Sequence, residues 1–403
     1  SDSAGGPARP YSAWRTLLPT TWAPLSVDGG ELGPGLGVAV GGQDVVERNT
    51  WGALVQVYTE TGRADAALGW IWRGLGTPQL GFSAVQDWDV LARSFLGPDD
   101  EVINTALLER ERAASAVATF PRPRFRSFSW LSAGVSVRDR SRELAEPDSA
   151  PGLALLDPPL DAGAALTAGI STARAYEYSI SAEDGVLAAV GVEGRRWLST
   201  PEGFAGARGY FRVAGRGQGY RGLRLGGFAR HAVAARVLGG ADFGSLSPGY
   251  SVGGYGGFAA GYPLSTSAGL GSELDLPVRG YDSGSQFGDR GVAATAEYRF
   301  PLTMVERGLG IHPLWLDRLW GAFFADVGTA WCVEACEPAL GFNDEPDPLR
   351  SVGAELGIDL SVGYFAPIAV RAGVAYPLDE VPLAGGGAVR REVRGYLLAG
   401  RSF

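Results

Sequence analysis

Few residues in this chain are of the types that act as general bases. The only histidines among its 403 residues are His231 and His312. His231 shares one face of a predicted strand with Val233 and Val237, which suits a packing side chain better than a base, and His312 lies in a predicted turn. Neither histidine stands in a Gly-x-Ser-x-Gly or similar setting, and a hydrolytic nucleophile needs a base close by. The sequence therefore predicts that the chain is not an enzyme.

The two cysteines and one glycine-rich segment offer little more chemistry. Cys332 and Cys336 stand in WCVEACEP, a spacing that fits either a short disulfide in an oxidising compartment or two free thiols. A metal site needs more ligands than these two residues and the distant histidines provide. The segment GRGQGYRG at 215–222 lies in strand-like sequence with no helix after it, so it is not a phosphate loop. No metal and no other cofactor is predicted.

Composition narrows the class of protein. The chain has 61 glycines, 11 tryptophans and one methionine, and its formal net charge is −9. A nucleic-acid partner is disfavoured because the chain has no excess positive charge with which to displace counterions from a phosphate backbone. The sequence contains no run of 18 apolar residues, so transmembrane helices are not expected. A membrane β-barrel is compatible with this composition, because only alternate residues of its strands face lipid.

Period-two alternation runs along most of the chain and predicts strands. In residues 352–362 the apolar side chains Val352, Ala354, Leu356, Ile358, Leu360 and Val362 alternate with small or charged ones. About sixteen such segments follow one another, each long enough for the roughly 9–11 residues that a tilted strand needs to cross a bilayer. Short turns alternate with longer loops at 142–163, 258–289 and 332–350, which is the outer-membrane barrel pattern.

These features predict an all-β fold: a transmembrane antiparallel β-barrel of about sixteen strands, spanning residues 31–403. A large soluble sandwich or propeller is the alternative, but its packed face would be richer in Leu, Ile and Phe. Residues 1–30, with their scattered prolines, are expected to be an irregular linker. The opening SDSAGGPARP lacks the features of a signal peptide and is interpreted as a linker or a processed end.

One stretch, VRGYDSGSQFGDRGVAATAEYRFPL at 278–302, resembles the loop-six motif of the BamA/TamA-type outer-membrane barrel superfamily, also called the bacterial surface antigen family. It is followed by FFADVGTAW, SVGAELGIDLS and PIAVRAGVAYPL, in the order of that family's last strands. Phe403 is similar to the C-terminal aromatic signal of such barrels. The N-terminal part is less specific, and it is similar to the entry into barrels that follow a TolB-like propeller.

The resemblance implies roles for individual residues. In the family this loop folds into the lumen, where its arginine pairs with carboxylates on the following strands. The motif residues here are Val278, Arg279, Gly280 and Tyr281, and the carboxylates are Glu297 and Asp326. Both carboxylates fall on the polar face of their predicted strands, and a buried guanidinium calls for such partners. Arg279 could instead occupy an ordinary exposed turn.

The resemblance also implies a function: protein insertion or translocation at the bacterial outer membrane of a Gram-negative cell. Expected partners are membrane lipid and client outer-membrane proteins, or periplasmic and surface subunits. The POTRA domains that insertases carry are not found in this sequence, so a second hypothesis is a non-catalytic anchor or pore that holds a periplasmic domain. A diffusion porin is disfavoured by the inserted loop and the Gly- and Ser-rich interior.

Overall fold

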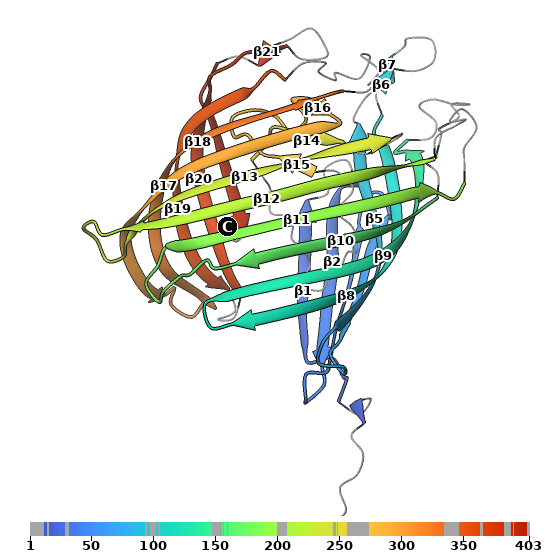
Figure 1. Ribbon diagram of the computed structural model, residues 1–403, viewed down its shortest axis with the longest axis horizontal. Helices are drawn as coiled ribbons and strands as arrows, with labels where there is room; N and C mark the ends of the chain where they lie inside the picture. The colour runs from blue at the N-terminus through green and yellow to red at the C-terminus, as the bar shows by residue number, and fades with distance from the viewer. Residues whose placement is uncertain are drawn as a thin grey trace, which may run out of the picture.

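The structure, a computed structural model, is built from β-strands, most of which join in a single antiparallel sheet (Figure 1). It describes residues 12–13, 16–28, 32–92, 95–96, 102–103, 105–146, 155, 157–158, 160–199, 208–244, 247, 249–255, 274–333, 346–362, 366–382, 388–389 and 391–400. No helix in these ranges is both long and apolar enough to cross a membrane.

The main sheet has sixteen strands, as the alternation predicts. In the order in which they pair, they are β1 (Thr21–Asp28), β2 (Pro34–Gln43), β3 (Asn49–Tyr58), β4 (Ala64–Trp72), β5 (Gln79–Ala92), β8 (Leu107–Arg124), β9 (Ser127–Leu144), β10 (Asp161–Ser171), β11 (Asp184–Trp197), β12 (Gly209–Leu223), β13 (His231–Gly244), β17 (Arg290–Gly308), β18 (Leu314–Trp331), β19 (Leu349–Val362), β20 (Ala366–Pro377) and β23 (Arg394–Gly400). Each strand follows its neighbour in sequence, apart from short strands in the loops. A two-sheet sandwich or a propeller, the soluble alternatives, does not describe this arrangement.

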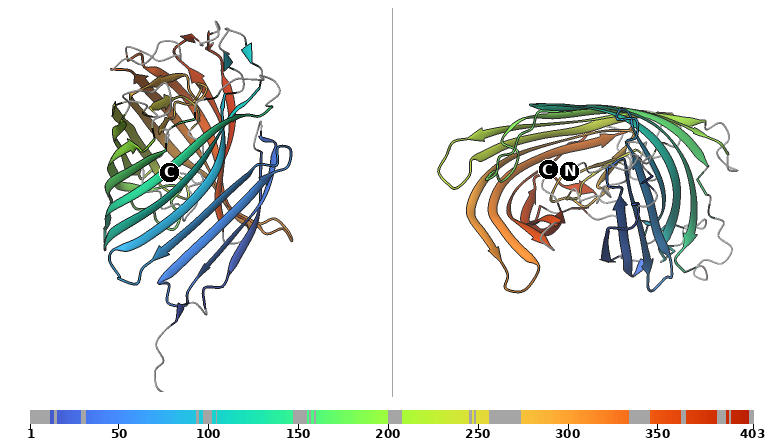
Figure 2. Two further views of the ribbon diagram at one scale, coloured as in Figure 1. Left: turned by 90° about the vertical axis from the view of Figure 1, so that its right-hand side faces the viewer. Right: turned by 90° about the horizontal axis from the view of Figure 1, so that it is seen from below.

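The sheet curves around a central space, so that it has a concave and a convex face (Figure 2). β1 and β23 are its two end strands, and their described residues do not pair with each other. A membrane barrel is expected to form a closed ring, in which the two end strands pair with each other. That closure is not seen among the described residues.

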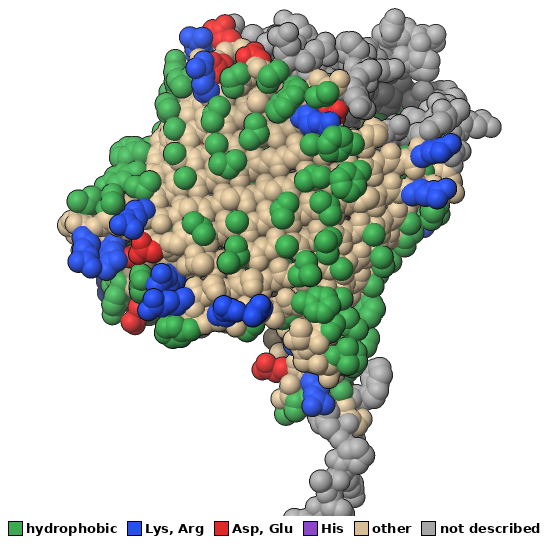
Figure 3. Space-filling view, in the orientation of Figure 1, with side chains coloured by type: hydrophobic (Ala, Val, Ile, Leu, Met, Phe, Trp, Pro, Cys, Tyr) green, Lys and Arg blue, Asp and Glu red, His purple; other side chains and the backbone are tan. Residues whose placement is uncertain are grey.

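Side chains divide between the two faces with period two. On β9, Val135 is 59% exposed on the convex face, whereas Arg138 is 4% exposed on the concave face. The wall seen in Figure 3 carries hydrophobic side chains across its middle, and its charged side chains gather toward the rims. An apolar outer band with a polar interior is the arrangement expected of strands that face lipid.

The sheet begins earlier than the sequence analysis predicts. β1 lies within the segment expected to be an irregular linker, and its Pro24 pairs in register with Val38 of β2. Proline is tolerated in an edge strand because its missing N–H can face away from the ladder. Prolines obscure the alternation at this end of the chain, which explains why the strand was missed.

Smaller sheets lie in the loops. The largest has three short strands, β14 (Tyr250–Val252), β15 (Leu274–Leu276) and β16 (Gln286–Gly288), which belong to the long connection from β13 to β17. Its side chains form a buried core with the concave face of the barrel wall: Tyr250, Val252, Leu276, Val278, Tyr281, Ala293, Ala330 and Leu349. The two-stranded sheets are β6 (Phe95–Leu96) with β7 (Val102–Ile103), and β21 (Val381–Pro382) with β22 (Ala388–Val389). The predicted insertion of the long loop is thus confirmed for its described residues.

Candidate functional site

Arg279 lies at the tip of the inserted loop and is almost completely buried against the concave face. The chain turns sharply after it, because Gly280 has a φ of 94°, which side chains with a Cβ rarely adopt. The backbone N–H of Arg279 donates to Asp326 on β18, so the main chain and the side chain of this residue are fixed to the same carboxylate. The preceding residue, Val278, is fully buried in the core of the loop.

Three carboxylates surround the guanidinium of Arg279. Its Nε and Nη2 donate to the two oxygens of Asp326 at 2.7 and 2.8 Å, a bidentate pair. Its Nη1 donates to Oε1 of Glu355 on β19 at 2.9 Å and lies 2.9 Å from Oε1 of Glu297 on β17. The guanidinium carbon also lies 3.5 Å from the ring centroid of Phe324 on β18. We call Arg279 with Glu297, Asp326 and Glu355 the loop clamp.

Charge within the loop clamp is balanced by two further arginines. Arg299, on the same face of β17 as Glu297, donates from Nε to Glu297 Oε2 at 2.8 Å. Arg371 on β20 lies 3.5 Å from Oε2 of Glu355. All three carboxylates are almost completely buried, and buried carboxylates require such partners to stay ionised.

Tyr281 holds the other side of the loop tip. Its hydroxyl donates to the carbonyl of Arg350 at 2.8 Å and accepts from the backbone N–H of Asp379 at 3.1 Å. Asp379 lies beyond the end of β20 and forms a bidentate pair with Arg350. The hydrogen bonds from Arg350 hold the pKa of the Asp379 carboxyl below its usual value. The loop is therefore fixed to the ends of β19 and β20 as well as to β18.

The last strand of the sheet is joined to the loop clamp. Tyr396 on β23 donates its hydroxyl to Oε1 of Glu355 at 2.6 Å, the same oxygen that accepts from Arg279. Its ring lies over Gly373 of β20, where a Cβ would come within 2.4 Å of it. Two contacts with the loop flank this bond: Arg394 donates to Asp282 at 2.7 Å, and the rings of Tyr255 and Tyr396 are 4.4 Å apart.

Changing Tyr396 to phenylalanine is expected to loosen β23. The ring stays in place, but Glu355 loses one donor, and a hydrogen bond to a charged group contributes about 1.5–3 kcal/mol. Amide hydrogen exchange should therefore become faster in β23 and little changed in β12 and β13. Tyr376→Phe is the matched control, since that side chain is 39% exposed on the convex face of β20. Equal exchange in the two variants would show that the hydroxyl of Tyr396 does not hold the strand.

A second buried ion pair fixes the start of the inserted loop. Arg212 on β12 and Asp242 on β13 are directly opposite each other and form a bidentate pair with distances of 2.7 and 2.8 Å. Both side chains are 0% exposed. Arg212 also donates to the carbonyl of Gly249 at 3.1 Å, and Asp242 accepts from the N–H of the same residue. The residue just before β14 is thus bound to the wall through both of its backbone polar groups.

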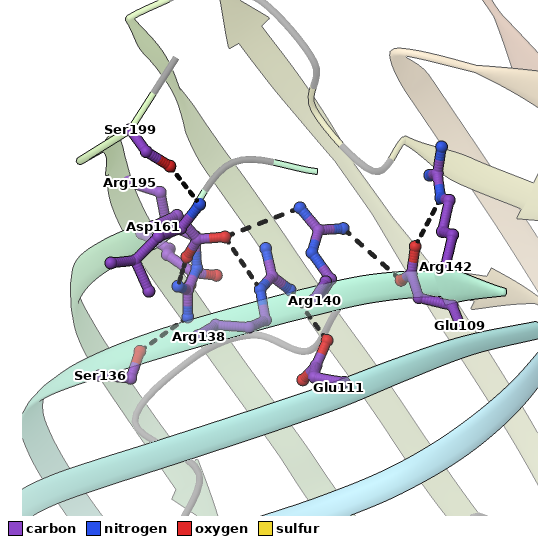
Figure 4. A network of polar contacts seen from close by, with 11 residues as sticks. Glu109, Glu111, Ser136, Arg138, Arg140, Arg142, Asp161, Arg195 and Ser199 are labelled. Carbon is purple, nitrogen blue, oxygen red and sulfur yellow. Dashed lines mark hydrogen bonds and ion pairs between the residues drawn. The ribbon is translucent and has the colours of Figure 1, made fainter. Parts of the chain in front are cut away.

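A third group of charges lines the wall between β8 and β11 (Figure 4). Asp161 on β10 is fully buried and accepts from Arg138 and Arg195, while Arg140 lies 3.7 Å away. Glu109 on β8 accepts from Arg142 at 3.0 Å. These pairs link four neighbouring strands across the concave face.

The other predicted site residues fall as follows. Cys332 is disulfide-bonded, but Cys336 lies outside the described residues, so their pairing stays a prediction. Phe403 also lies outside the described residues. His231 lies within hydrogen-bond distance of the Tyr298 hydroxyl (2.6 Å) and the Gly226 carbonyl (2.9 Å), which suits the packing role predicted for it.

Sequence reasoning placed Glu355 on the inward face but missed its contact with Arg279, and it missed Tyr396 altogether. Alternation shows that Glu355 faces inward, yet it does not show which residues of adjacent strands are level with each other. The pair Arg212–Asp242 was missed for the same reason. For Glu355 and Asp242 a signal was present, because each is a charged residue on a strand face that otherwise holds many Gly, Ala or Ser residues.

Comparisons with known proteins identify the fold. No protein-family model matches the chain, and no curated protein sequence matches it either. Among solved structures, CdiB from Escherichia coli is similar with a TM-score of 0.60 and 11% identity, covering 94% of this chain and 62% of that one. BamA from Haemophilus ducreyi, in a structure lacking POTRA domains 1–3, has a TM-score of 0.56 and 14% identity, covering 94% and 69%.

The chain thus spans about 62% of the length of the CdiB structure that it matches. The similarity extends over nearly the whole of the present chain. Sixteen antiparallel strands, an apolar convex face and the inserted loop agree with the resemblance seen in the sequence. The chain has the fold of the BamA- and CdiB-type outer-membrane β-barrels.

Proposed function

We propose that this chain is the membrane-spanning barrel of a system that inserts proteins into the outer membrane of a Gram-negative bacterium or moves them across it. The observation that carries this proposal is the loop clamp on the concave face of a sixteen-stranded sheet, together with its bond to the last strand. The loop contacts β23 at the end of the sheet, where a client chain could be added.

The end of the sheet has the physical properties that such a role requires. Among the described residues, seven pairs join β23 to β20, and on its other side β23 pairs with no described strand. A strand edge in hydrocarbon needs hydrogen-bond partners, and an added strand supplies them. A client segment that pairs with β1 or β23 would therefore be stabilised as it enters the membrane.

No catalytic role is proposed. Residues Gly249–Gly253 match the spacing Gly-x-Ser-x-Gly, but Ser251 lies inside the short strand β14 and is 3% exposed. In hydrolases the serine of this motif stands at a sharp strand-to-helix turn. This serine therefore belongs to the packing of the inserted loop.

A second candidate is a non-catalytic anchor or pore. It is favoured by the three groups of buried ion pairs, which connect neighbouring strands of the wall on its concave face. In that case the barrel holds a periplasmic or surface domain, and the three groups of buried ion pairs serve to keep the wall rigid.

Photocrosslinking to a client distinguishes the two candidates. A photoreactive phenylalanine is placed at Leu397 of β23, which is 72% exposed on the convex face, and the purified barrel in liposomes is given an unfolded outer-membrane barrel protein. The control position is Leu356, near the middle of β19 and two strands away from β23. Its side chain is 59% exposed on the same face. Insertion predicts crosslinks at Leu397 and few at Leu356, with faster folding of the client than in liposomes without the barrel. Equal crosslinking and unchanged client folding would favour the anchor.

A further inference from the structure

The connection between β10 and β11, residues 172–183, is much longer than the 2–5 residues that a hairpin needs. It starts at the rim where β1 begins, because the strands alternate in direction from β1 to β10. The inserted loop between β13 and β17 comes from the opposite rim. Rather than extending away from the barrel, residues 172–183 fold onto the concave face, and we call them the strap.

The strap is anchored by an apolar contact far from its own strands. Ile180 is 5% exposed and packs with Trp320 and Ala322, whose side chains lie on the concave face of β18. Phe228 and Ala229, from the turn between β12 and β13, complete this cluster. Burying a side chain of this size contributes about 1.5–3 kcal/mol, so the contact is strong enough to hold a short segment in place.

Arg318 adds polar anchors beside the apolar one. Its Nη1 donates to the carbonyl of Ser179 at 2.6 Å, and both terminal nitrogens lie 3.5 Å from the carbonyl of Glu177. The same guanidinium is oriented by Asp317, to which Nη2 donates at 2.6 Å. Arg318 therefore contacts two backbone carbonyls of the strap. The positions of these carbonyls depend on how the strap is folded.

The strap is also ordered internally. Ser179 donates to Glu183 at 2.6 Å and accepts from the backbone N–H of Tyr176 at 2.8 Å. Glu183 is 3% exposed and lies 3.6 Å from Arg230, whose guanidinium is 5.9 Å from the ring of Tyr176. The strap thus has a defined shape that presents Ile180 to the wall.

The span of the strap is large. Between β11 and β18 the sheet contains β12, β13 and β17, so four steps separate the hairpin from its anchor. With about 4.8 Å between neighbouring strands, the strap reaches across roughly 19 Å of wall. A segment that bridges this distance inside a curved sheet must cover part of the space that the curve encloses.

We propose that residues 172–183 are a strap that partly closes the interior of the barrel at the rim where β1 begins. The strap is held by Ile180 on Trp320 and by Arg318, and it opens when these anchors are released. A polypeptide or solute that enters from this rim has to displace it. This inference does not depend on whether the barrel inserts proteins, since it rests on contacts that the loop clamp does not share.

Two variants release the strap in different ways. Arg318→Ala removes the polar anchors, and Ile180→Ser removes the apolar anchor without changing any barrel strand. Arg307→Ala is the matched control, because it removes an exposed arginine from β17 close to the neighbouring turn. Folding of each variant is checked by the mobility of the unheated protein on gels, and Ile180→Ser serves as the test if Arg318→Ala does not fold.

Two measurements in nanodiscs then decide the proposal. Hydrogen exchange of the amides in 174–183 should be about tenfold faster in both variants, because Arg318→Ala loses a hydrogen bond from a charged group and Ile180→Ser loses a buried apolar side chain. The second measurement uses Gln218→Cys, a concave position on β12, in a chain that also carries Cys332→Ser and Cys336→Ser. A bulky, membrane-impermeant maleimide should label this thiol faster in both variants than in the control.

The outcomes separate cleanly. Faster exchange together with faster labelling supports the strap as a partial closure. Unchanged exchange would show that the strap is not held by these anchors, and faster exchange with unchanged labelling would show that it does not cover the interior. Either of the last two results overturns the proposal.

Discussion

Replacing Arg279 with alanine is expected to lower the free energy of unfolding by about 3–5 kcal/mol, the typical cost of removing one partner of a buried ion pair. Asp326 would lose the bidentate donors that balance its charge, and Glu355 would keep only Tyr396 and the more distant Arg371. The charge of Glu297 would be the least affected, because Arg299 still donates to it. The temperature at which the folded barrel unfolds on semi-native gels should fall accordingly.

Two further variants test whether this loss arises from unpaired charge. Arg279→Lys keeps the charge but loses the planar fork that matches Asp326. Its unfolding temperature should therefore lie between that of the wild type and that of Arg279→Ala. The double variant Glu297→Gln, Asp326→Asn should reproduce much of the loss of stability, because it removes two of the negative charges that face Arg279. Arg307→Ala, an exposed arginine on β17, should change little. If Arg279→Ala unfolds at the same temperature as this control, the loop clamp does not stabilise the barrel.

Arg212→Ala should have an effect of similar size but through a different part of the loop. It removes the bidentate donor of the buried Asp242 and leaves the carbonyl of Gly249 without the donor it has in Arg212. A loss of about 3–5 kcal/mol is again expected. Hydrogen exchange should also become faster in β14, because Gly249 immediately precedes that strand.

The control for this second prediction lies on the same strand. Arg216→Ala removes an arginine from the same face of β12, one that is exposed rather than buried. A double-mutant cycle of Arg212 and Asp242 isolates the energy of the pair from the effect of truncation. Coupling close to zero would mean that the pair is retained for a reason other than stability.

The sequence predicted the barrel and part of the loop clamp because both depend on alternation. Glu297 and Asp326 were assigned to the inward face from period two alone, and the structure places both beside Arg279. Around these two residues the strands pair without a register shift, so the parity of each residue is unambiguous. The position of Arg279 itself came from the resemblance, since an arginine followed by glycine is equally compatible with an exposed turn.

What could not be predicted depends on register and on distant contacts. Tyr396 and Glu355 meet across an intervening strand, and nothing in either segment specifies how far β23 is shifted against β20. The strap is a stronger case: the bond between Ser179 and Arg318 joins residues 139 positions apart. Its sequence appears only as a longer connection between two strands. β1 was missed because its prolines break the alternation on which the other strands were recognised.

The single oxygen of Glu355 shared by Arg279 and Tyr396 has a thermodynamic consequence. Because one acceptor serves both donors, departure of one changes the charge that the other meets, and the two contacts form a linked equilibrium. Linkage is reciprocal: if release of β23 weakens the hold on the loop by some factor, release of the loop must weaken the hold on β23 by the same factor. A molecule that binds the loop more tightly in its released state than in its held state would therefore weaken the hold of the last strand on its neighbour without touching either strand.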